Sequence, residues 1–500
     1  MTSVPNLRLQ LNGNNQLWLI LIVFLVASCD LFKPVQTDSP RSTDQDDELD
    51  EVQGRRVYDP ETGTYIVIEN APTEKMDTIR WRNVPVDPEQ IIRSSEESFI
   101  VDEPGAGPAR ELGSEIIAPN VETKFLSSYN VTMMLPFLSD RFSPTSEKLP
   151  ANSDWALHFY SGAKMALEDL ESEDISMTVS VIDGRETSMS AVQQLLRSSE
   201  DLQKAQLIIG PYRSETARLV ADFAKRNNSV VFSPYTTSTE ITSNNPNYVQ
   251  VNPSLRSHCE AITRHARQRF NPEQIVLVCR DKPQEIERLQ YFQNENARIS
   301  GSYDVTRLKE YIVSDEAELS SSDMFSLISL EDTTVFILPS WSNEAFIYNF
   351  LRNLDLARRE NSKIVVYGMP QWMDYEIIDY DYYERLNVHV SSSTYLNPLS
   401  SDVQFFRNRF FDRYGTLPNE EAYLGYDVTM YCGKMLKQHG TKFQYALEQE
   451  PMQMLHTYFD FERVVSPTAT SGTENLPIQR FENKYVNILK FQNYQFKLAD

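Results

Sequence analysis

The segment QLIIGPYRSETARLVADFAKRNNSVVFSPYTT, residues 206–237, decides the fold of this chain. Two short apolar runs, 206–209 and 230–232, flank a stretch in which small apolar residues recur at helical spacing, and Ser214 is suited to cap the start of that helix. A strand, an amphipathic helix and a second strand predict a parallel βαβ unit with a right-handed crossover. The segment therefore predicts an open, mainly parallel sheet.

Hydroxyl side chains follow both predicted strands. Ser214 comes after the first strand, and Ser233, Thr236 and Thr237 come after the second. In open parallel sheets, ligands bind beyond the carboxyl ends of the strands. These side chains are suited to hold a small polar molecule, and none of them is obviously reactive.

The α/β pattern begins near Asn130 and continues through the chain as two successive sets of strand–helix units. Extended stretches near 249–253 and 391–397 predict crossings that act as a hinge. We therefore predict two doubly wound parallel-sheet lobes with a cleft between them. The expected boundaries are 125–250 plus 391–436 for the first lobe, and 251–390 plus 437–500 for the second.

The N-terminus carries an apolar segment, 17–28, which is shorter than the roughly 20 residues that span a bilayer. It ends in Val-Ala-Ser before Cys29, which resembles the lipobox of bacterial lipoproteins. That resemblance implies a signal peptide at 1–28 and a lipid-anchored Cys29 outside the cytoplasm. The alternative is an ordinary secretory signal with an incidental cysteine. Residues 29–124 are polar and acidic, which predicts a disordered tether with a small hairpin within 58–81.

The overall composition limits the classes of function. The net charge is −24, so the chain would repel phosphate backbones and nucleic-acid binding is not expected. Apolar residues make up 41% of the chain, enough for sizeable cores. Cys259 and Cys279 are expected at one end of a helix–strand pair, either as a disulfide or as free buried thiols.

We do not expect an enzyme, a cofactor or a metal site. Ser161-Gly-Ala-Lys164 matches the S-x-x-K pattern of penicillin-recognising enzymes, but it lies inside a predicted helix and no K-T-G motif accompanies it. His258 and His265 do not have the spacing of an H-E-x-x-H zinc pair, and no cysteine pair has metal-ligand spacing. A G-x-S-x-G motif and a glycine-rich phosphate loop are also absent from the sequence.

Between about 130 and 496 the chain resembles the type I periplasmic-binding-protein family, which includes leucine/isoleucine/valine-binding proteins and receptor ligand-binding regions. Four short motifs in the family's order carry the resemblance: 209–214 (IGPYRS), 233–237 (SPYTT), 410–415 (FFDRYG) and 425–427 (GYD). The resemblance implies that Ser214, Tyr235 and Thr237, with Thr236 beside them, hold the α-carboxylate of an amino-acid-like ligand.

The chain departs from the family pattern in the second set of units. Residues 280–285 (RDKPQE) stand where an aromatic residue commonly stacks on the ligand. After Gly368, Gln371 and Trp372 replace the acid that would pair with an ammonium group. Burying an ammonium group without a counter-charge is costly, which argues against a simple α-amino acid as the ligand. Trp372 is expected in an aromatic wall that suits a larger organic ligand or a protein partner.

Two functions are therefore expected. The first is a lipid-anchored, extracytoplasmic solute-binding protein of the cell envelope that works with an ABC-transporter permease and binds an amino-acid-like or other small polar solute. The alternative is a non-enzymatic outer-membrane lipoprotein that regulates a cell-wall synthase through protein contacts. The long acidic tether and the missing acid favour the alternative.

Overall fold

The computed structural model describes residues 54–59, 64–69, 122–142, 153–184, 188–301, 306–314, 319–465 and 477–499. The chain divides into two compact units, 1–109 and 110–500. In the smaller unit, β1 (Gly54–Asp59) pairs antiparallel with β2 (Thr64–Glu69). The hairpin therefore begins before the predicted range 58–81. The predicted signal peptide, Cys29 and most of the predicted tether lie outside the described residues.

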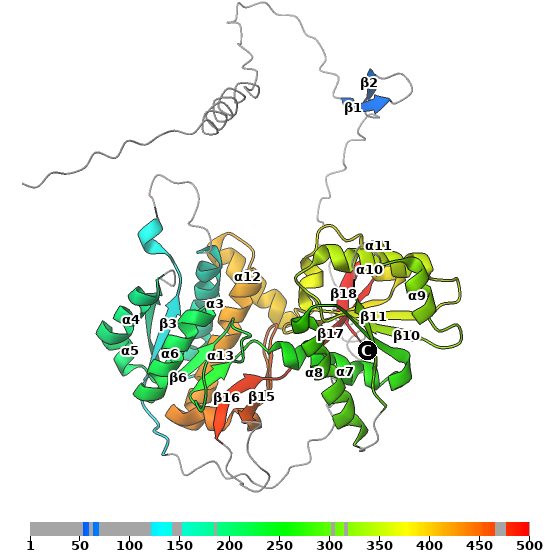
Figure 1. Cartoon of the computed structure of the whole chain (residues 1–500). Coiled ribbons are helices and arrows are strands. Elements are labelled where there is room, and N and C mark those ends of the chain that lie inside the picture. The colour runs from blue at the N-terminus through cyan, green and yellow to red at the C-terminus, as the bar shows by residue number, and fades with distance from the viewer. Residues whose placement is uncertain are drawn as a thin grey trace, which may run out of the picture. The chain divides into compact units, whose positions relative to one another are not determined.

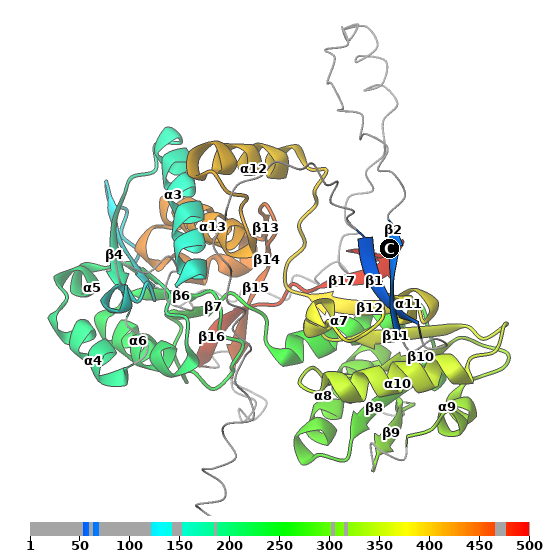
Figure 2. The ribbon, with the colours of Figure 1, turned by 90° about the horizontal axis from the view of Figure 1, so that it is seen from above.

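The larger unit contains two seven-stranded sheets, each forming one lobe (Figures 1 and 2). The first sheet has the order β15-β16-β7-β6-β5-β3-β4, and all of its pairings except β15–β16 are parallel. Its strands are β3 (Tyr129–Leu135), β4 (Met177–Asp183), β5 (Leu207–Ile209), β6 (Val230–Ser233), β7 (Tyr248–Gln250), β15 (Phe461–Val465) and β16 (Ile478–Asn483). The helices of this lobe are α3 (Asp154–Ser172), α4 (Met189–Ser198), α5 (Glu200–Lys204), α6 (Ser214–Asn227), α12 (Ser401–Tyr414) and α13 (Glu420–His439).

The second sheet has the order β18-β17-β12-β11-β10-β8-β9, with antiparallel pairing at β12–β17 and β17–β18. Its strands are β8 (Ile275–Arg280), β9 (Lys309–Val313), β10 (Thr334–Ile337), β11 (Ile364–Gly368), β12 (Val388–Ser392), β17 (Asn487–Gln492) and β18 (Gln495–Leu498). The helices of this lobe are α7 (Leu255–Arg267), α8 (Pro283–Ser300), α9 (Ser321–Leu327), α10 (Glu344–Ala357), α11 (Tyr380–Arg385) and the 3-10 turn η4 (Pro370–Asp374).

Short elements fill the remaining described part of the larger unit. The 3-10 turns are η2 (Ser139–Arg141), η3 (Pro272–Gln274), η5 (Gly440–Tyr445) and η6 (Leu447–Gln449), and β13 (Met452–Gln453) pairs antiparallel with β14 (Tyr458–Phe459). Among the described residues, no helix is long and apolar enough to cross a membrane, and no group of His, Cys, Asp or Glu side chains could hold a metal ion.

Each lobe has its own hydrophobic core, which confirms the predicted two-lobed α/β fold. The predicted boundary of the second lobe is wrong for residues 437–465 and 477–483. β16 pairs in parallel with β7, through Phe481 with Val249 and Glu482 with Gln250, so this part of the chain completes the first sheet. Of the described strands after residue 437, only β17 and β18 belong to the second sheet.

Helices α3 and α13 of the first lobe pack closely because glycines lie at their crossing. A Cβ atom on Gly162 would come within 1.8 Å of the Ala422 carbonyl oxygen, and one on Gly425 within 2.0 Å of the Phe159 carbonyl oxygen. Figure 2 shows α12 and α13, from late in the chain, beside α3, from early in the chain. The motif at 425–427 therefore serves helix packing. Next to Gly425 along α13, Tyr426 donates to Asp169 of α3.

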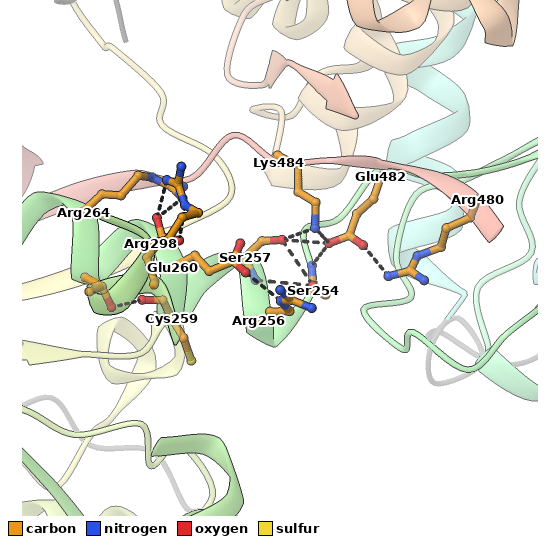
Figure 3. A network of polar contacts seen from close by, with 12 residues as sticks. Ser254, Arg256, Ser257, Cys259, Glu260, Arg264, Arg298, Arg480, Glu482 and Lys484 are labelled. Carbon is orange, nitrogen blue, oxygen red and sulfur yellow. Dashed lines mark hydrogen bonds and ion pairs between the residues drawn. The ribbon is translucent and has the colours of Figure 1, made fainter. Parts of the chain in front are cut away.

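The lobes are joined by three crossings, β7 to α7, β12 to α12 and β16 to β17. Figure 3 shows that Glu482, at the end of β16, links the first and third crossings. Its carboxylate accepts hydrogen bonds from the Ser254 amide (3.2 Å), the Ser257 hydroxyl (2.8 Å) and Lys484 Nζ (2.8 Å), and Arg480 lies on its other oxygen. Burial alone would raise the pKa of Glu482, but Lys484 and Arg480 outweigh it and lower the pKa to about 2. A charged, fully buried carboxylate thus fixes the start of α7 to the first sheet.

Candidate functional site

The hydroxyl residues predicted from the two strand ends do meet in the first lobe. Ser214 Oγ lies 3.0 Å from Thr236 Oγ1, although these residues are on different segments. Ser214 is exposed and Thr236 is 4% exposed. The predicted N-cap is one residue off: Arg213 takes the extended N-cap conformation, and Ser214 is already the first helical residue. The Ser214 hydroxyl is consequently directed to Thr236.

This group of residues lies at the N-terminus of α6. The side chain of the N-cap residue, Arg213, makes no capping hydrogen bond, and the only acid in the first turn of α6 is Glu215. The first turn of a helix carries a partial positive charge and amide donors, so it favours an anionic group. Thr237 follows Thr236 and is exposed. We refer to Ser214, Tyr235, Thr236 and Thr237, together with the aromatic residues described next, as the first edge.

Three aromatic side chains cover the first edge. The ring centroid of Trp155, from the start of α3, lies 4.5 Å from that of Tyr212 and 4.8 Å from that of Tyr235, and the two tyrosine rings are 4.9 Å apart. Tyr235 is half-buried, whereas Tyr212 is 41% exposed. The sequence reasoning missed Trp155 and Tyr212. Their contact joins distant segments, and the only available signal was the position of Tyr212 in the turn after the first strand.

Trp372, the predicted aromatic wall, lies in the core of the second lobe. It is fully buried, and its Nε1 donates to the Ser340 carbonyl oxygen at 2.9 Å. Tyr383 donates its hydroxyl to the Trp372 carbonyl oxygen at 2.8 Å, and a Cβ atom on Gly368 would lie 2.3 Å from the indole. The absence of a side chain on Gly368 thus leaves room for this ring. The predicted contact of Trp372 with a ligand stays a prediction, and the geometry favours a packing role.

In the second lobe, the polar groups that follow the corresponding strands form hydrogen bonds with one another. Arg280, at the end of β8, donates its backbone N–H (3.1 Å) and its Nε (2.9 Å) to Glu285, and Ser340 donates its hydroxyl to the same carboxylate (2.9 Å). Burial alone would raise the pKa of Glu285, but the hydrogen bonds from Arg280 outweigh it and lower the pKa. We call Arg280, Glu285, Ser340 and Trp372 the second edge. Its one buried carboxylate is already neutralised by an arginine.

The cysteine alternative left open by the sequence is resolved. Cys259, Cys279 and Cys432 are free and buried. Burial raises the pKa of the Cys279 thiol to about 12, so this thiol is protonated at neutral pH.

Comparisons with known proteins agree with this architecture. The model of the receptor family ligand binding region matches residues 159–453. No curated protein sequence matches the chain. A putative branched-chain amino acid ABC transporter protein of Rhodospirillum rubrum is 12% identical with a TM-score of 0.54, covering 74% of this chain and 100% of that one.

A periplasmic ligand-binding protein of a branched chain amino acid ABC transporter from Burkholderia xenovorans is 11% identical with a TM-score of 0.50, covering 74% of this chain and 94% of that one. At these identities the likeness establishes the fold alone.

Proposed function

This chain belongs to the receptor family ligand binding region, and we propose that it is an extracytoplasmic solute-binding protein whose ligand is held at the first edge. The family match covers more than half of the chain, and two-lobed proteins of this fold named as ABC-transporter binding proteins are similar to it. Binding without catalysis is the proposed activity. A permease is the proposed protein partner.

The observation that carries the proposal is the 3.0 Å contact between Ser214 and Thr236 beside the N-terminus of α6. Two hydroxyls and a helix N-terminus favour a carboxylate or another small anionic group. The exposed face of Tyr212, supported by Trp155, provides an aromatic surface for the rest of the molecule. The ligand class is therefore a small polar solute with an anionic end, such as an amino-acid-like compound.

Isothermal titration of the full chain against a panel of amino acids and other small carboxylates tests this proposal. The double variant Ser214→Ala/Thr236→Val should weaken binding by about a hundredfold, since two hydrogen bonds to a charged group contribute about 1.5 kcal/mol or more each. Ser198→Ala removes a hydroxyl that bonds only within α4 and is the matched control. Equal affinity in the double variant and the control would place the ligand elsewhere.

A second function has one observation in its favour. At the second edge, Glu285 is neutralised by Arg280 and Trp372 is enclosed, so neither provides a counter-charge for an ammonium group. This arrangement favours a protein that regulates a cell-wall synthase by contact and binds no solute. Failure of every compound in the panel, combined with activation of a purified peptidoglycan synthase by the chain, would decide for this function.

We also propose that Cys29 carries the lipid anchor and that residues 1–28 are removed. Three acyl chains on one cysteine would hold the protein stably at a membrane. Phase partitioning in a detergent that clouds on warming should place the wild-type protein in the detergent phase and a Cys29→Ala variant in the aqueous phase. The outcome against the proposal is a wild-type protein that stays in the aqueous phase.

A further inference from the structure

The second lobe has a hollow that no part of the proposed function uses. It encloses about 540 Å³ and is lined by residues 373–376 and 378–380, together with Tyr494 from the turn between β17 and β18. The lining residues therefore come from η4, the loop after it, the start of α11 and the last turn of the chain. None of them belongs to the first edge.

The tyrosines of this hollow are held in place. Tyr494 donates its hydroxyl to Asp381 at 2.7 Å, and its backbone N–H donates to Glu384 at 3.4 Å. The Tyr380 ring packs on Phe491 with centroids 5.4 Å apart. Tyr375 donates its hydroxyl to the Trp341 carbonyl oxygen. Tyr494 is nevertheless 62% exposed and Tyr380 44% exposed, so the hollow presents aromatic surface that is already ordered.

The charge of the hollow has one sign. Asp374, Glu376 and Asp379 line it, and no lysine, arginine or histidine does. In the part of the chain that the structure describes, no ion pair reaches these three acids. The nearby Arg385 is bound to Asp355 and Asp381 instead. Carboxylates beside tyrosine rings are the groups that bind a guanidinium or ammonium ion, by charge-assisted hydrogen bonds and by cation–π contact.

We propose that this hollow binds a basic segment of a partner protein, with an arginine or lysine side chain seated between the carboxylates and the tyrosine rings. Charge complementarity selects this occupant, because an acidic or uncharged apolar segment would bury Asp374 and Glu376 without a counter-charge. The aromatic rings that are exposed in the free protein would be covered by the partner, and the area buried in this way would anchor the interface.

Fluorescence anisotropy with a labelled arginine-rich peptide tests the proposal on the full chain. A peptide with citrulline in place of arginine keeps the shape and removes the charge. The arginine peptide should bind at least about tenfold more tightly than the citrulline peptide, and raising the salt concentration should weaken it. Asp374→Asn/Glu376→Gln should reduce the affinity by about tenfold, and Tyr494→Ala by about threefold.

The control must separate this hollow from the general attraction of a cation to an acidic protein. Glu331→Gln/Asp332→Asn changes the net charge by the same amount, at an exposed turn of the same lobe. This variant should bind the arginine peptide within about twofold of the wild type. Equal losses in the two double variants, or equal binding of the two peptides, would overturn the proposal. Circular dichroism melting curves that coincide for all variants would show that folding is unchanged.

Discussion

The two lobes contain similar sheets but use the carboxyl ends of their strands in opposite ways. At the first edge, Ser214 and Tyr212 keep exposed surface beside a helix N-terminus. At the second edge, Arg280 and the Ser340 hydroxyl donate to Glu285, Trp372 donates to the Ser340 carbonyl oxygen, and these side chains are mostly enclosed. The same position in a doubly wound sheet therefore holds a surface available for binding in one lobe and an internal polar cluster in the other. Position in the fold alone therefore does not identify a ligand-binding site. The polar groups at that position must also be exposed and free of strong partners within the protein.

The largest expected effect comes from removing the enclosed indole. Trp372→Ala should lower the free energy of unfolding by about 3–5 kcal/mol, because it leaves a cavity and breaks the hydrogen bond to Ser340. Tyr212→Ala, at the first edge, should cost about 1 kcal/mol, since its ring is only partly buried. Urea unfolding followed by far-UV circular dichroism measures both. Similar costs for the two variants would remove the contrast between the edges.

The acids in the first turns of α6 and α8 give a matched pair. Glu285→Gln should destabilise the protein by about 3 kcal/mol, because Arg280 would keep its charge in a mostly buried place without a counter-charge. Glu215→Gln, on the exposed first turn of α6, should change stability by about 0.5 kcal/mol or less. The same urea titration separates them. A mild Glu285→Gln variant would mean that the second edge is open to solvent.

Acidification should affect the second lobe first. Burial lowers the pKa of His258, in α7, and of His389, in β12, to about 4. The two neutral histidines contribute stability that is fully present above pH 6.5 and is lost as the pH falls toward 4. The reason is that the histidines are protonated in the unfolded chain at a higher pH than in the folded lobe. The loss should reach about 2–3 kcal/mol for each histidine. Glu482, whose pKa is lowered from 4.5 to about 2, begins to lose its contribution only as the pH falls below 4.5, and the loss is complete near pH 2.

Hydrogen exchange at pH 7 and pH 4.5, read by mass spectrometry, measures this difference between the lobes. Peptides from α7 and β12 should lose protection at the lower pH before peptides from β5 and β6 do. A His389→Gln variant should show a weaker pH dependence in the same peptides. Simultaneous loss of protection in both lobes would contradict the prediction.

The smallest expected effects concern single hydroxyls. Thr236→Val should weaken the binding of a solute by about tenfold and leave stability within about 1 kcal/mol. Ser340→Ala should do the reverse: it should cost about 1 kcal/mol of stability, because Glu285 loses a hydrogen bond, and leave solute affinity unchanged. Titration calorimetry and urea unfolding on both variants decide this. Weaker solute binding by the Ser340→Ala variant would show that the second edge is part of the binding site.

Much of the fold followed from local patterns, because short apolar runs and helical spacing report neighbouring structure directly. The meeting of Ser214 and Thr236 was also predictable, since the carboxyl ends of adjacent parallel strands lie together. The aromatic cover of the first edge was not, because Trp155 reaches Tyr212 only through the packing of α3. Trp372 was expected to face a ligand, but the missing side chain of Gly368 lets the ring lie in the core.

The assignment of residues 437–465 and 477–483 to the second lobe failed for a related reason. The sequence of β16 itself does not indicate that this strand pairs with β7 of the first sheet rather than with a strand of the second sheet. Long-range strand pairing depends on which edge remains uncovered, and a reading of periodicity does not contain that information.

The place of β16 in the first sheet has a consequence for synthesis on the ribosome. Val249 in β7 emerges early but gains its neighbour Phe481 only after all five parallel strands of the second lobe have appeared. The first sheet thus stays incomplete until β16 has been made, and a nascent chain stalled before residue 478 would carry a β7 strand that pairs with β6 on one side only. Such an exposed strand edge is a template for aggregation, so we expect nascent chains of this protein to depend on chaperones until β16 is made.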